Sequence, residues 1–93
     1  MGGGIVTART GTTMILRPGP NDAIIATVDC LAGETVIGGG VRTEATVPGD
    51  LERMHLQESG PDGNGWLARA SATSRFSPNS TFTVTATVYC LAP

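Results

Sequence analysis

The sequence has no lysine, a single histidine and only four aromatic residues among its 93 positions. Six arginines, scattered singly, stand against eight acidic residues, which gives a formal net charge of −2. Nucleic-acid binding needs a basic stripe that displaces counterions, so this distribution argues against a nucleic-acid partner. No stretch approaches the ~20 apolar residues of a membrane span, and we expect no membrane partner.

The patterns of common catalytic and metal-binding chemistry are also missing. His55 is the only base available for a Ser-His-Asp triad, and no GxSxG motif accompanies it. One histidine and two cysteines provide too few ligands for a zinc site. Gly33 and Gly38 have the spacing of a phosphate-binding loop, but the lysine that such a loop requires is absent. We therefore predict a protein that is not an enzyme, with no catalytic residue, no metal and no cofactor.

Threonine, glycine and β-branched apolar residues are abundant, and this composition favours strands over helices. Clusters of Gly, Pro, Asn and Asp recur about every 12 to 17 residues, a spacing typical of all-β sandwiches and barrels. We predict a single domain over residues 1–93: an antiparallel β-sandwich or jelly-roll-like barrel of six or seven strands. The expected strands lie near residues 12–17, 23–30, 35–46, 53–59, 66–73 and 81–91, with a shorter one near 5–9.

The beginning of the chain is interpreted differently from the rest. Residues 1–11 are expected to form an N-terminal arm or to be an expression scar, because MGGG has neither the basic start nor the apolar run of a secretory signal peptide. Met1 is then either part of such a scar on an extracellular domain or the native start of a virion protein.

A short repeat contains both cysteines. The octet ATVDCLAG at 26–33 returns as ATVYCLAP at 86–93, with six of eight positions identical. Period-two alternation places Cys30 and Cys90 on the apolar, inward side of their strands. We expect two core strands, side by side or face to face, joined by a Cys30–Cys90 disulfide. The alternative is a pair of free, buried thiols.

The same alternation defines a candidate contact surface. On the final strand the threonines, among them Thr83, Thr85 and Thr87, share the side opposite the core. The glycine tract from Gly38 to Gly40 lies inside another expected strand, where glycines indicate a bulge, a bend or the close approach of another group. We predict that Gly38, Gly39, Gly40 and these threonines accept a neighbouring surface.

Trp66 is the only tryptophan, and alanines alternate after it along its strand. A large ring beside small residues is typical of a core in which the ring fills the space that its neighbours leave. The alternative is a sugar-stacking platform made by Trp66 with Tyr89.

Three segments together resemble a small domain of exported bacterial proteins: CLAGETVIGGG, ESGPDGNGWLARA and TVTATVYCLAP. That domain has a CPAG…GGG…SxP…GW…TVxAxxxC pattern and forms C-terminal heads of collagen-like and phage fibre-type proteins. The matching residues are Cys30, Ala32, Gly33, Gly38, Gly39, Gly40, Ser59, Pro61, Gly65, Trp66 and Cys90, whereas Leu31 replaces the usual proline. The resemblance covers about residues 26–92 and implies a β fold with no catalytic residue.

These observations favour a non-enzymatic structural or interaction module on a virion or an extracellular appendage, of the decoration or fibre-head type. Its expected partners are further copies of itself, with a trimer as one arrangement, or a capsid or fibre protein. The expected location is extracellular or on the virion surface. The alternative function is that of a carbohydrate-binding module for a surface glycan, with Trp66 and Tyr89 as its contacts.

Overall fold

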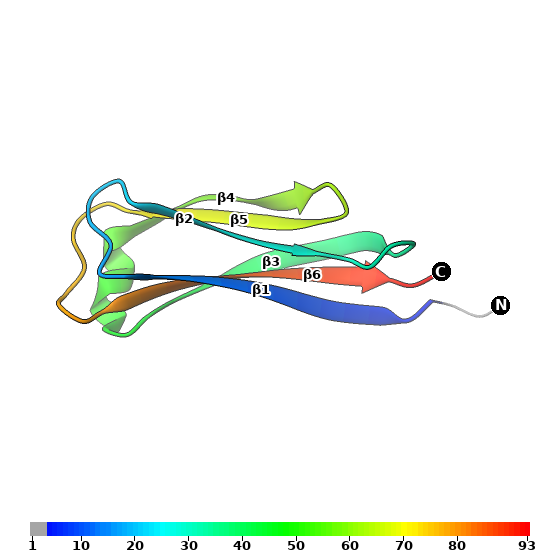
Figure 1. The fold of residues 1–93 in the computed structure, drawn as a ribbon, viewed down its shortest axis with the longest axis horizontal. Coiled ribbons are helices and arrows are strands. Elements are labelled where there is room, and N and C mark those ends of the chain that lie inside the picture. The colour runs from blue at the N-terminus through cyan, green and yellow to red at the C-terminus, as the bar shows by residue number, and fades with distance from the viewer. Residues whose placement is uncertain (1–3) are drawn as a thin grey trace.

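The computed structural model, which describes residues 4–93, is a sandwich of two three-stranded antiparallel sheets (Figure 1). Sheet A has the order β1-β6-β3, with β1 at Val6–Leu16, β6 at Thr81–Leu91 and β3 at Thr35–Ala45. Its central strand is therefore the last one in the chain. This placement fits the sequence of β6, which alternates threonine or tyrosine with apolar residues from Thr81 to Tyr89.

Sheet B has the order β2-β5-β4, with β2 at Ala23–Asp29, β5 at Gly65–Ala72 and β4 at Met54–Asp62. A 3-10 helix, η1 at Pro48–Arg53, carries the chain from β3 to β4. The predicted all-β sandwich of antiparallel strands is confirmed, and residues 4–93 form six strands.

The core lies between the inner faces of the two sheets. Residues that alternate along β6 from Phe82 to Cys90 are at most 1% exposed, and Ala68, Ala70 and Ala72 of β5 oppose them at 2% or less. Alanines on the inner face of sheet B let the two sheets approach closely, because each contributes little volume to the space between them. The alternation predicted for the final strand is confirmed.

The interpretation of residues 1–11 as an arm or a scar is wrong from Val6 onward, because β1 is one strand that pairs with β6 from Val6 to Leu16. Residues 1–3 lie outside the described part of the chain. Gly11, in the middle of β1, lies against the carbonyl oxygen of Thr27, where any Cβ would overlap. A glycine that suggests a strand break in the sequence thus permits a close crossing of β1 and β2.

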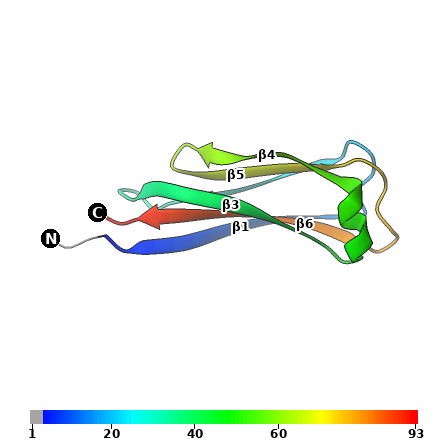
Figure 2. The ribbon, with the colours of Figure 1, turned by 180° about the vertical axis from the view of Figure 1, so that it is seen from behind.

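The sandwich is elongated, with extents of 54 × 19 × 17 Å. Its two ends differ, as Figures 1 and 2 show: the start of β1 and the C-terminus lie near one end, and η1 crosses between the sheets at the other. We call these the terminal end and the η1 end. Among the described residues, no helix has the length and apolar character needed to cross a bilayer.

Candidate functional site

The predicted disulfide joins the two sheets at the terminal end. Cys30, directly after β2, and Cys90 of β6 have their sulfurs 2.01 Å apart and their Cα atoms 5.7 Å apart. The two repeated octets therefore lie face to face, one in each sheet. Each supplies the same inward row of alanine, valine and cysteine, which explains why the chain contains nearly the same strand twice.

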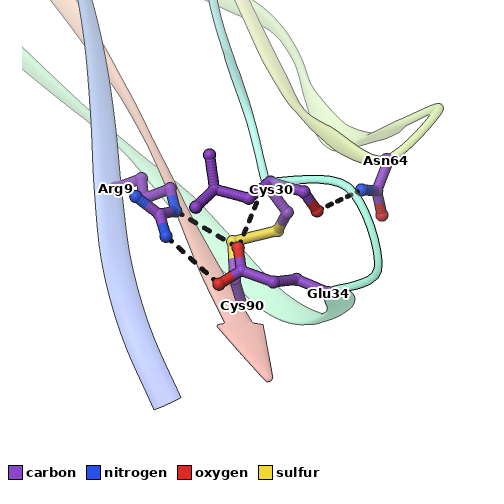
Figure 3. Close-up of a disulfide and its surroundings, with 6 residues drawn as sticks. Arg9, Cys30, Glu34, Asn64 and Cys90 are labelled. Carbon is purple, nitrogen blue, oxygen red and sulfur yellow. Dashed lines mark hydrogen bonds and ion pairs between the residues drawn. A yellow bond between two sulfur atoms is a disulfide. The ribbon is translucent and has the colours of Figure 1, made fainter. Parts of the chain in front are cut away.

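An ion pair lies beside this disulfide (Figure 3). Arg9 donates from Nη2 to the Glu34 carboxylate at 3.1 Å, and the backbone N–H of Leu31 donates to the same carboxylate at 2.8 Å. These hydrogen bonds, that of Arg9 first, hold the pKa of Glu34 below its ordinary value. Glu34 lies within 4.8 Å of both cysteine sulfurs, but sulfurs bonded to each other are not the thiolates that a metal ion would need.

The largest regular surface is the side of sheet A that points away from sheet B, which we call outer face A. The register of β6 with its neighbours places the predicted contact residues Thr83, Thr85 and Thr87 there, beside Thr10 and Thr12 of β1. The hydroxyl groups of Thr12 and Thr85 lie 3.1 Å apart, in hydrogen-bonding distance. Cross-strand threonine pairs of this kind stiffen a sheet.

The glycine tract is divided between the two faces of sheet A, which corrects part of the predicted contact surface. Gly38 and Gly40 pair with Tyr89 and Thr87 and lie on outer face A. Gly39 faces the core instead, where a Cβ would overlap the ring of Trp66 and lie 2.6 Å from the carbonyl oxygen of Thr87. The tract therefore accepts another group closely, as predicted, but at Gly39 that group belongs to the same chain.

Trp66 and Tyr89 are on opposite sides of sheet A. The Trp66 ring packs between the sheets over Gly39, and its indole N–H donates to Ser59 Oγ at 3.0 Å. Tyr89 is 44% exposed on outer face A, beside Gly38. The proposed stacking platform of two aromatics is therefore not formed, because the sheet separates the rings.

Exposed apolar side chains lie at both ends of outer face A. Met14 and Leu16, 63% and 66% exposed, lie toward the η1 end, and Val6, 54% exposed, lies with Tyr89 toward the terminal end. Sequence reasoning missed Met14 and Leu16, because the run MIL is apolar at three successive positions and does not reveal which of them faces outward. The pairing of β1 with β6 decides this.

Outer face A is thus a threonine-rich strip with an apolar area toward each end, a suitable surface for association. His55, by contrast, is exposed on the outer side of edge strand β4, opposite Ser71.

Compared with protein families, with curated proteins and with solved structures, the chain matches none of them.

Proposed function

We propose that this chain is a non-enzymatic structural or interaction module, displayed on a virion or an extracellular appendage as a decoration or fibre-head domain. It associates with a particle protein or with further copies of itself through outer face A. The observation that carries this proposal is the exposure of Met14, Leu16, Val6 and Tyr89 on one face of a rigid sheet.

The size of outer face A supports association. Strands of eleven residues extend about 36 Å at ~3.3 Å per residue, and three strands span roughly 14 Å. The resulting flat area, about 500 Å² before side-chain relief is added, is of the order of the ~800 Å² that each partner buries in a standard interface. A small net charge of −2 opposes the approach of two such surfaces only weakly.

The disulfide is compatible with an extracellular or other oxidising location, where such bonds persist. The resemblance to heads of collagen-like and fibre-type proteins supports the same placement. In that setting the long shape of the sandwich presents outer face A along its full length.

Light scattering and sedimentation of the purified chain over a wide concentration range test this proposal. We expect an oligomer, or a monomer that co-purifies with a particle protein. Met14→Arg should weaken that association by at least tenfold, because it introduces a charge into an apolar part of outer face A. Ile25→Arg, at a 42% exposed position on sheet B, is the matched control and should leave association unchanged. A clean monomer without a particle partner would contradict the proposal.

A glycan is the second candidate partner, and Tyr89 is the observation that favours it. Its exposed ring lies on a face rich in hydroxyl groups, and aromatic rings of this kind stack against sugars. A glycan array with the wild-type chain and with Tyr89→Ala tests this alternative. Binding that disappears in Tyr89→Ala would support it, and the absence of binding to any glycan would exclude it.

A further inference from the structure

The four edge strands of the sandwich differ in how their free edges are covered. β1 and β2 cover each other: Thr13 Oγ1 of β1 donates to the carbonyl oxygen of Ile25 at 2.8 Å, and Gly11 lies against the carbonyl oxygen of Thr27. These two edges are therefore closed within the chain. The open side of the sandwich is the one bounded by β3 and β4, which faces the viewer in Figure 2.

On that side β4 is poorly suited to pair with another strand. Its register with β5 shifts between Leu56 and Glu58, and Pro61 lies within it. Bulges and prolines of this kind are how proteins prevent edge-to-edge pairing. β4 is thus irregular in both of the ways that discourage a neighbouring strand.

β3 is irregular only at its beginning. The register shifts between Val36 and Gly38, but from Gly38 to Ala45 it follows β6 without interruption, and β3 contains no proline. Because β3 is the last strand in the order β1-β6-β3, its second edge has no strand partner among residues 4–93. A regular edge of this length that contains no proline is a template for pairing with another chain.

The charges on this edge strand suit a second copy of the same strand. Arg42 and Glu44, the neighbours of Thr43 in the sequence, both point to outer face A. Their side chains are 76% and 58% exposed, and Arg42 Nε lies 3.5 Å from Glu44 Oε1. If two copies of β3 pair antiparallel about a twofold axis at Thr43, each Arg42 lies directly opposite Glu44 of the other copy. Opposed residues in such a pair have Cβ atoms about 4.5–5.5 Å apart, within reach of an ion pair. Axes at Arg42 or at Glu44 would instead place like charges opposite each other.

We propose that the chain forms a twofold-symmetric dimer in which the β3 edges pair antiparallel about Thr43 and sheet A continues across both copies. Gly40 of one copy then lies opposite Thr46 of the other, and η1, which begins at Pro48, ends the overlap. The dimer also joins two copies of outer face A into one surface and so extends the proposed function. The dimer rests on that function only because both require the chain to associate with itself.

The side chains next to this edge favour its coverage. Val41 and Ala45, on the inner face of β3, are only partly buried, and Leu56 across the open side is 42% exposed. A second copy on the β3 edge would shield part of this apolar area from water, as well as satisfying backbone groups of the edge.

Charge exchange at these two positions tests the pairing. Arg42→Glu and Glu44→Arg each place like charges opposite each other, and each should raise the dissociation constant by at least tenfold. An equimolar mixture of these two variants should form a heterodimer, and the double variant Arg42→Glu/Glu44→Arg should dimerise like the wild type. Glu52→Arg, on the exposed surface of η1, changes the net charge by the same amount as Glu44→Arg and should have no effect. Sedimentation equilibrium gives the masses, and circular dichroism verifies that each variant is folded.

Two results would overturn this proposal. One is an oligomer whose mass is unchanged in both single variants; association through outer face A would then remain, and Met14→Arg would still disrupt it. The other is a monomeric wild type, which excludes the dimer even if the chain binds a particle protein. Slower amide hydrogen exchange from Gly40 to Thr46 on dimerisation would locate the paired segment directly.

Discussion

The two ends of the sandwich hold the sheets together by different means. At the terminal end the link is covalent: Cys30 and Cys90 close a sequence separation of 60 residues. The polar groups around it are partly open to water, since the Arg9 side chain is 29% exposed. Here the cross-link restricts the unfolded chain, and Val88, Val36 and Trp66 are among the residues that pack around it.

At the η1 end no disulfide is present, and a buried carboxylate takes its place. Asp50 is 2% exposed and accepts hydrogen bonds at 3.0 Å from both the backbone N–H and the hydroxyl of Ser77. Burial alone would raise the pKa of Asp50, but the hydrogen bonds from Ser80 and Ser77 outweigh it and hold the pKa below its ordinary value. The rings of Phe76 and Phe82 pack at this end, with centroids 5.3 Å apart.

The difference shows two solutions to the same problem. A domain of 93 residues has a thin core, so the ends of its sheets need additional stabilisation. The disulfide destabilises the unfolded state, whereas the Asp50 cluster depends on a folded arrangement that satisfies a buried charge. We therefore expect the two ends to respond differently to mutation and to pH.

The largest effect is expected from removing the disulfide. The double variant Cys30→Ala/Cys90→Ala should lose about 4 kcal/mol of unfolding free energy, as the chain-entropy relation gives for a loop of this length. At roughly 4–8 °C per kcal/mol, its melting temperature should fall by well over 10 °C. Thermal and urea denaturation followed by circular dichroism measure this. Reduced wild type is the control, and a double variant that melts close to the oxidised protein would contradict the prediction.

The next largest effect is expected at Asp50. Asp50→Ala leaves the Ser77 backbone N–H without its acceptor, so the melting temperature should fall, although by less than without the disulfide. Hydrogen exchange should accelerate at Ser77 and along η1 while the terminal end keeps its protection. Asp62→Ala, which removes an exposed carboxylate at the end of β4, is the control. Equal acceleration at both ends would show that the ends are not independent.

A smaller effect is expected from acid. The pKa values of Asp50 and Glu34 are both lower in the folded protein than the ordinary 3.8 and 4.5, so both carboxylates stabilise the fold above these values. That contribution is lost as the pH falls below about 4.5 and through the folded pKa values. The melting temperature should therefore fall less steeply with decreasing pH in Asp50→Asn and in Glu34→Gln than in the wild type. Thermal denaturation at a series of pH values measures this dependence. An unchanged acid slope in both variants would rule out this assignment.

The smallest effect is expected from Arg9→Gln. This substitution removes the ion pair to Glu34, but the pair is partly exposed and the disulfide already holds this end. We expect a shift of no more than a few degrees in melting temperature, and about 1 M salt should reduce it further. In the Cys30→Ala/Cys90→Ala variant, the same substitution should lower the melting temperature by a larger amount if the ion pair then holds this end in place of the disulfide.

Much of the fold could be predicted from local patterns. The alternation of threonine with apolar residues identified β6 and its inner face, and the matched octets identified the disulfide. The continuity of β1 could not be predicted, because Gly11 reads as a break between the expected strands near 5–9 and 12–17 unless the crossing with β2 is known. The run VPGD reads as a turn, and only its place between the sheets shows that it begins a 3-10 helix with a buried aspartate.

The sequence by itself determined which side chains face inward along β2 and β6, because there the pattern of side chains follows a clear period of two. It also determined that Cys30 and Cys90 occupy equivalent inward positions. Only the tertiary structure decided that Gly39 lies under Trp66 while Gly38 and Gly40 remain on outer face A, and that β3 keeps an open edge. Such features depend on the order of the strands and the distance between the sheets, which result from contacts between residues far apart in the chain.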